Sequence, residues 1–217
     1  MKKYLLILAI LACVVILVIA TVALLTPWMD RWGATNQEVA AALPGDELVL
    51  NPAETVTRVV TIQAAPEEIF LWLLQMGADK GGLYSISWLE ANLLRCKLVN
   101  ADRIHPEWLD LKVGDQMKMC PGDFGPPPYE VAQIKPDQAL VLGHRSSDGW
   151  AETWQFVLQP QSDSSVRLVM RNRSEMSGGI WTVLHPGIFI MQRAMLLGIK
   201  DRAEQMSAVG FVQNVND

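Results

Sequence analysis

Residues 185–206 read HPGIFIMQRAMLLGIKDRAEQM, and this stretch decides the fold. On a helix of 3.6 residues per turn, five long apolar side chains fall within one arc: Ile188, Met191, Met195, Ile199 and Met206. A surface helix buries about a third of its circumference. Because Ile190 and Leu197 on the opposite side are also apolar, this helix, expected from about Pro186 to Met206, needs cover on most sides. A strongly curved sheet folded around it supplies that cover, and a core helix of another α+β fold is the alternative that periodicity leaves open.

An uncharged apolar run follows Lys2 and Lys3 and extends from Tyr4 to Leu25. About 20 apolar residues form a helix that crosses the hydrocarbon core of a bilayer. The run is also longer than the apolar core of a cleavable signal peptide, which has about 7–15 residues. We therefore expect a transmembrane signal anchor at residues 1–27. The Ala12-Cys13 pair is similar to a lipoprotein cleavage site, so cleavage or lipidation is the alternative.

The charge distribution predicts the location of the chain. Lys2 and Lys3 should stay in the cytoplasm, which places the rest on the exported side of the inner or plasma membrane, with a single span. Of the 18 Lys and Arg residues these two precede the apolar run, which leaves 16 against 23 Asp and Glu, a net charge of −7. No basic patch follows from such a balance, so we expect no nucleic-acid partner.

The cysteine pattern sets limits on metal and redox chemistry. Cys13 lies inside the apolar run, so Cys96 and Cys120 are the only pair able to form a disulfide outside the membrane. An exported compartment permits that bond, but the spacing does not show it. The sequence contains no CxxC motif and no Cys/His cluster with metal-ligand spacing, and we expect neither a metal nor a cofactor.

The remaining segments predict an α+β domain. A connector at residues 28–53 precedes a domain at residues 54–207, and residues 208–217 form a tail. The domain begins with a strand near Glu54–Gln63 and two helical pieces. Further strands are expected at Gln116–Cys120, Tyr129–Ile134, Ala139–His144, Glu152–Gln159 and Val166–Arg173. Consecutive strands with short turns favour an antiparallel meander that ends in the long helix.

This order resembles that of the START/Bet v 1/polyketide-cyclase (SRPBCC) superfamily, and in particular a membrane-anchored bacterial subgroup of unassigned function. The matching motifs are Ala65–Phe70, Gln75–Ser85, Trp88–Glu90, Asn100–Trp108, Leu111–Asp115, Trp154–Leu158 and Met195–Glu204. The resemblance implies a helix-grip fold, in which a curved antiparallel sheet surrounds the long C-terminal helix. It also implies a cavity between the two, where members bind lipids, sterols, polyketides or hormones, and where some catalyse cyclisation or dehydration.

The first functional hypothesis is a membrane-tethered domain that binds an apolar or amphipathic small molecule, lipid-like or polyketide-like, in that cavity. Such sites have apolar walls with few polar groups. The expected walls are Trp154, Phe156, Met191 and Met195, and the expected entrance residues are Tyr84, Trp88 and Trp108. The 176–192 segment carries no charge apart from His185 if that is protonated, and it either touches the bilayer or forms a lid over the cavity.

The second hypothesis is an enzyme of the cyclase/dehydrase type, with Glu152, Asp102 and His105 as candidate proton-transfer groups. Glu152 shares its strand face with Trp154, so it is either a buried carboxylate with a raised pKa or a solvated group near the strand end. Asp102 and His105 lie in a polar segment before Pro106, where hydrogen-bonded loop structure is the favoured interpretation.

The third hypothesis is a module whose tryptophan-rich surface docks a partner protein without any ligand. An enclosed cavity of several hundred Å³ favours the first two hypotheses, and a filled interior favours the third. The alternation in the last strand places Arg171 and Arg173 opposite its apolar face, and we expect both on an exposed surface.

Overall fold

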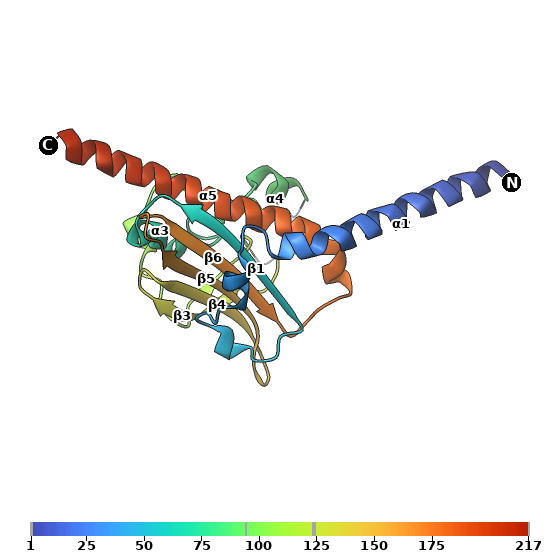
Figure 1. Cartoon of the computed structure of the whole chain (residues 1–217), viewed down its shortest axis with the longest axis horizontal. Coiled ribbons are helices and arrows are strands. Elements are labelled where there is room, and N and C mark those ends of the chain that lie inside the picture. Colours follow the sequence, from blue (N-terminus) through green and yellow to red (C-terminus); the bar gives the residue numbers. More distant parts are fainter. Residues whose placement is uncertain (1, 94, 123–124, 217) are drawn as a thin grey trace.

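A six-stranded antiparallel sheet and the long C-terminal helix form the two main layers of the computed structural model (Figure 1). The structure describes residues 2–93, 95–122 and 125–216, and statements on side chains exclude those of 2, 93, 180–181 and 210–216. The spatial strand order is β1-β6-β5-β4-β3-β2. The strands are β1 Glu54–Ile62, β2 Gln116–Met117, β3 Tyr129–Lys135, β4 Ala139–Ser146, β5 Gly149–Pro160 and β6 Val166–Ser174.

Local sequence signals explain where the shorter helices begin. Thr35 and Glu38 form a reciprocal capping box at the start of α2. Pro66 opens α3 at a position where its missing N–H costs nothing, and Glu67 and Glu68 follow in the positive first turn. The helices and 3₁₀ turns are α1 Lys2–Asp30, α2 Asn36–Ala40, η1 Asp46–Leu48, α3 Pro66–Leu74, α4 Ser87–Leu93, η2 Pro106–Trp108 and α5 Ile180–Asn216.

Helix α5 packs along the inner face of the sheet, as the helix-grip prediction requires. Met195, Leu196 and Ile199 are at most 2% exposed and share one core cluster with the inner-face side chains Phe156 and Met170. The α+β helix-grip architecture is therefore confirmed.

The predicted start of this helix is wrong, because α5 begins at Ile180 and contains Pro186. A proline in a helix removes one backbone hydrogen bond. Here the break falls in the first two turns of α5, where most side chains are exposed, and the helix continues through it.

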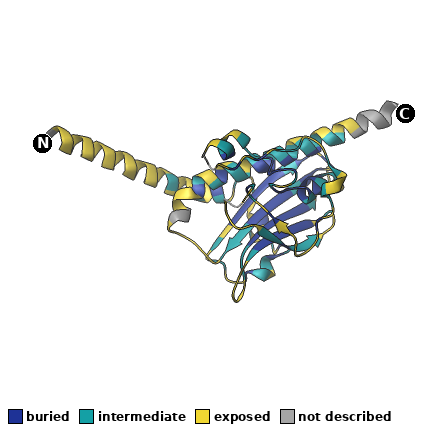
Figure 2. Cartoon of the chain, turned by 180° about the vertical axis from the view of Figure 1, so that it is seen from behind, coloured by how far each residue is buried: buried dark blue, intermediate teal, exposed yellow. Residues whose placement is uncertain are grey.

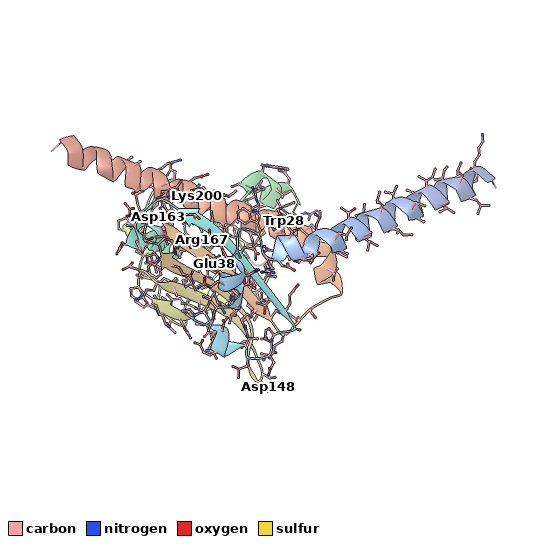
Figure 3. The ribbon with its side chains drawn as sticks, viewed as in Figure 1. Trp28, Glu38, Asp148, Asp163, Arg167 and Lys200 are labelled. Atoms are coloured by element: carbon pink, nitrogen blue, oxygen red, sulfur yellow. A yellow bond between two sulfur atoms is a disulfide. The ribbon has the colours of Figure 1, made fainter. Side chains whose placement is uncertain are left out.

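The connector packs against the outer face of the sheet. Leu43 packs with Val59, Val157 and Val169 in a second apolar cluster on that face. Arg167 of β6 binds the Glu38 carboxylate, with 2.7 Å between Nε and Oε1, and Figure 3 shows the two side chains together.

The expectation that Arg171 and Arg173 are exposed is wrong. Arg171 is 2% exposed and donates to the carbonyl oxygens of Glu38, Val39 and Ala41 and to the Asp46 carboxylate. Arg173 donates to the Val49 carbonyl. Both side chains reach out of the sheet into the connector, so polar residues on the outer strand face mark a covered surface.

Helix α1 extends away from the two layers, and its side chains are largely exposed (Figure 2). Two helical segments of the described chain, Lys3–Asp30 and Thr182–Val209, are long and apolar enough to cross a membrane. None of the first segment's most apolar stretch is buried, whereas the second is the core helix of the domain. The N-terminal helix is therefore suited to span a bilayer, and the topology of the chain stays a prediction.

Cys96 and Cys120 form a disulfide with 5.1 Å between their Cα atoms. The bond joins the segment after α4 to the segment after β2, two irregular stretches with few ladder hydrogen bonds. Cys13 is a free, exposed thiol on α1.

Candidate functional site

Three polar side chains meet on the inner face of the sheet, and we call Tyr129, His144 and Glu152 the polar triad. The Tyr129 hydroxyl donates to Glu152 Oε1 over 2.9 Å. His144 Nδ1 lies 3.1 Å from Glu152 Oε2. A carboxylate on β5 is thus held from two sides by groups on β3 and β4.

Strand register brings the triad together. Glu152 has the same parity as Trp154 and Phe156, so it points to the inner face. In the β4–β5 ladder His144 is the direct partner of Glu152. Tyr129 begins β3, and its ring stacks on the His144 imidazole with 3.9 Å between ring centroids. Three strands each contribute one side chain at the same level of the sheet.

Hydrogen bonding favours the charged form of His144. Its Nδ1 faces Glu152, and its Nε2 lies 3.1 Å from the Pro127 carbonyl oxygen. Since both ring nitrogens face acceptors, the imidazolium satisfies both contacts and a neutral ring satisfies one. The bond to Glu152 is the main reason that the pKa of His144 is raised above 6.5. Burial, and next the Glu152 charge, raise the pKa of Tyr129 well above its ordinary value.

The triad remains accessible from one side. The His144 side chain is 24% exposed to solvent and the Glu152 side chain 21%. Glu152 pairs with Ser174, the last residue of β6, so the triad lies at the end of the sheet from which α5 starts. A solute that reaches this end contacts the polar triad before the apolar core.

Trp154 provides an unpaired donor next to the triad. Its side chain is 2% exposed, and its ring centroid lies 5.4 Å from that of Tyr129. Within the described residues the buried indole Nε1–H has no hydrogen-bond acceptor. A buried donor without a partner costs about 1–3 kcal/mol. An acceptor atom on a bound molecule, or a water, would recover that free energy.

The other expected wall residues lie in different surroundings. Phe156 and Met195 are buried in the core, and Met191 is half-buried with its carbonyl accepting from the Ser85 hydroxyl. The expected entrance residues do not share one environment: Tyr84 is buried, Trp108 half-buried and Trp88 69% exposed. Their role in ligand binding stays a prediction.

Side chains fill the space between the sheet and α5. Trp154, Phe156, Leu168, Met170, Met195 and Leu196 are all at most 2% exposed. Two open hollows lie elsewhere on the described surface, one of about 340 Å³ beside Trp150 and one of about 500 Å³ beside Pro160. None of the expected wall or entrance residues lines either hollow. The expected enclosed cavity is therefore not present between these side chains.

The polar segment around residue 100 is a hydrogen-bonded loop. Asn100 Oδ1 accepts from the backbone N–H groups of Leu83 and Tyr84 over 3.1 and 2.7 Å. The buried Gln75 accepts from the backbone N–H of His105 over 3.0 Å. These contacts agree with the loop interpretation.

The remaining two catalytic candidates lie apart from Glu152. Asp102 is exposed, and His105 contacts Glu107 and stacks on Trp108. The hydrogen-bond partners of Glu152 are Tyr129 and His144, so the structure joins it to neither Asp102 nor His105. Among the described residues no group of three potential metal ligands forms a metal site.

Sequence reasoning selected Glu152 and Trp154 but missed Tyr129 and His144 as their neighbours. The residues are far apart in the chain and form no local motif. Pairing β4 with β5 across the tight turn at residues 147–148 would have placed His144 opposite Ala151, and a register shift between His144 and Arg145 brings it opposite Glu152 instead. The position of Tyr129 depends on the register of β3, which no turn signal fixes.

Comparisons with known proteins give no family and no function for the chain. No family model matches the sequence, and no curated protein matches it. Solved structures with similar folds include CalC, a self-sacrificing resistance protein from Micromonospora echinospora, at 15% identity and a TM-score of 0.48, covering 73% of this chain and 99% of that one. Protein MLL2253 from Mesorhizobium loti has 16% identity and a TM-score of 0.44, covering 70% and 98%. The Aha1 protein from Colwellia psychrerythraea has 16% identity and a TM-score of 0.42, covering 70% and 97%. At such values the likeness carries no further argument.

Proposed function

We propose that this chain is a membrane-tethered domain that binds an amphipathic small molecule, lipid-like or polyketide-like, on the inner face of its sheet. The polar end of the molecule contacts the polar triad, and its apolar part enters the core beneath α5. The observation that carries this proposal is the buried, unpaired indole N–H of Trp154 beside Tyr129. A bound acceptor at this position satisfies the indole.

The placement of the triad supports a guest that arrives from the membrane. Glu152 is level with Ser174, after which the chain passes into α5. Helix α1 contacts α5 through Trp28 and Phe189, whose ring centroids are 5.3 Å apart. An amphiphile that leaves the bilayer beside α1 therefore meets the end of the sheet that carries the triad.

Binding of a guest requires the filled core to rearrange. The core is rich in methionine, which makes such repacking possible. The inner core contains the buried methionines Met76, Met117, Met170 and Met195, with Met119 and Met206 partly buried against it. Methionine is unbranched and repacks at low cost. The filled core is also what a partner-docking module without ligand would have, so ligand binding has to be tested directly.

A second candidate function is proton transfer at the triad, as in a cyclase/dehydrase-type enzyme. The observation in its favour is that His144 faces two acceptors while remaining 24% exposed. An imidazolium held in this way can donate a proton to a bound molecule, and the neutral ring that remains can still donate its other N–H to an acceptor such as Glu152. This function requires the same binding step as the first.

Native mass spectrometry of the detergent-extracted full-length protein tests the binding proposal. We expect one amphiphile per chain on the wild type and on the Trp150→Phe variant, because the Trp150 ring packs against Arg145 and is not part of the expected site. The Trp154→Phe variant keeps the ring but loses the N–H donor, and its bound fraction should fall. An adduct-free protein from every extract contradicts the proposal and favours the docking module.

A further inference from the structure

The first turns of α5 expose apolar side chains that the domain does not cover. Val183 is 74% exposed, Leu184 45% and Ile190 48%. From Met176 to Gln192 the chain contains no Asp, Glu, Lys or Arg. Further along, α5 carries charged residues on its exposed side and packs its apolar side in the core. The beginning of the helix therefore presents a cluster of unpartnered apolar side chains, and Val209 is the other exposed large apolar residue described on α5.

This surface lies next to the place where α1 leaves the domain (Figure 1). His185 Nε2 is 2.6 Å from Asp30 Oδ1, so the surface is tied to the last residue of α1. Trp28, itself 55% exposed, packs edge-on against Phe189 of α5. The exposed residues of α1 and of the start of α5 form one continuous region (Figure 2).

Buried contacts hold α1 at a defined angle to α5. Arg58 is 1% exposed, and its Nε donates to the Met29 carbonyl over 2.8 Å. Its guanidinium also contacts Gln192 of α5 and lies 3.9 Å from the Asp30 carboxylate. Burial lowers the pKa of Arg58 to about 10, which leaves it charged at neutral pH. A charged group locked between both helices prevents α1 from acting as a loose tether.

We propose that Val183, Leu184 and Ile190 insert into the boundary between headgroups and acyl chains of the bilayer that α1 spans. We call these residues the seating surface. The bilayer is the occupant because the seating surface adjoins the spanning helix, lacks charge and is held in position by Arg58 and Asp30. Interfacial helices bind membranes through such apolar side chains, and Trp28 is a residue type enriched at that depth. The proposal depends on α1 spanning the bilayer and not on ligand binding.

Nitroxide labels on the full-length protein in phosphatidylcholine vesicles test this proposal. The label is attached to Val183→Cys, or to Asp201→Cys as a matched control on the exposed side of α5, each in a Cys13→Ser background. Collision rates with oxygen and with a water-soluble nickel complex are compared. Oxygen concentrates in the bilayer, so we expect a several-fold higher oxygen-to-nickel ratio at position 183 than at position 201.

Equal ratios at the two positions overturn the proposal. Shielding of position 183 that persists in detergent, together with spin–spin broadening, also overturns it, because a second copy of the chain would then cover the surface. A label on the native Cys13 tests the premise. If that label is accessible to nickel in vesicles, α1 does not span the bilayer, and the proposal fails for that reason.

Discussion

Arg171 joins β6 to the connector through several side-chain hydrogen bonds, and no local sequence pattern indicates them. Its guanidinium donates to three carbonyl oxygens of the connector, to Asp46 and to the Thr57 hydroxyl. A buried charge that satisfies its donors in this way is costly to remove, because its partners are left without donors. The connector's position on the sheet depends on this side chain.

The Arg171→Met variant should lose about 3–5 kcal/mol of unfolding free energy, the range for breaking a buried charge pair. Denaturant unfolding in detergent measures the loss, and limited proteolysis should cut the freed connector. Arg145→Met is the control, since Arg145 pairs with Glu130 in an exposed position on the same sheet. Losses of equal size in the two variants would show that the buried contacts of Arg171 stabilise the fold no more than the exposed Arg145–Glu130 pair does.

The His144–Glu152 contact predicts a specific pH dependence. The pKa of His144 in the folded chain is raised above 6.5, so its contribution to stability is complete below pH 6.5 and is lost as the pH rises through the folded-state pKa. The free energy of unfolding of the wild type should therefore fall over that interval more than that of His144→Gln. Urea unfolding across the pH range checks this, and parallel profiles for the two proteins would contradict it.

At the scale of single residues, the sequence predicted which side chains face inward but not which groups they meet. Alternation along β5 placed Glu152 with Trp154 correctly on one face. The same alternation placed Arg171 on an exposed surface, because a period of two distinguishes two faces and does not report what covers each one.

The backbone of α5 approaches the backbone of the loop that carries Tyr84 closely at Gly198. A Cβ atom added to Gly198 would lie 2.1 Å from the Tyr84 carbonyl oxygen, which leaves no room for any other residue. Gly187 lies in the same helix with nothing within 4 Å of such an atom. The two glycines therefore make a matched pair for testing how α5 contacts the loop that carries Tyr84.

Gly198→Ala should destabilise the domain by about 1–3 kcal/mol, because overpacking forces the backbone apart. Gly187→Ala should be neutral or stabilise α5 by up to about 1 kcal/mol, since alanine is the better helix former. Thermal unfolding of the two variants separates the effects. If both substitutions stabilise the protein, α5 does not approach Tyr84 as closely as described.

The disulfide between Cys96 and Cys120 also holds irregular segments in place, namely those that follow α4 and β2. Replacing both Cys96 and Cys120 by alanine should lower the free energy of unfolding by about 3 kcal/mol, because the bond closes a loop with a sequence separation of 24 residues. Cys13→Ser is the control and should have no such effect, since Cys13 is exposed on α1. Unchanged stability of the double variant would show that the loop is ordered without the bond.

At the scale of elements, the apolar arc from Ile188 to Met206 predicted the core helix, because burial on several sides requires apolar residues all round. Its start was misplaced because Pro186 is also a good first helical residue, and only tertiary contacts such as His185 to Asp30 extend the helix before it.

For the whole molecule, element order together with the motifs that resemble the SRPBCC superfamily predicted the helix-grip architecture, whereas the periodicity of the long helix alone left another α+β fold open. The covering of the outer face, the triad and the filled core could not be predicted. The triad depends on strand register, and the covering of the outer face depends on contacts between segments over 100 residues apart, such as Glu38 with Arg167. The contact between Trp28 and Phe189 likewise places the end of α1 beside α5.

The central claim is that an amphiphile binds beside the indole of Trp154. The most direct measurement is the indole N–H resonance of Trp154 in ¹⁵N-tryptophan-labelled protein, assigned with Trp154→Phe, as extracted and after co-extracted lipid is removed by detergent exchange. We predict that lipid removal shifts this resonance while that of Trp150, which packs against Arg145 outside the expected site, stays in place. A Trp154 resonance unchanged between the two samples would contradict the account.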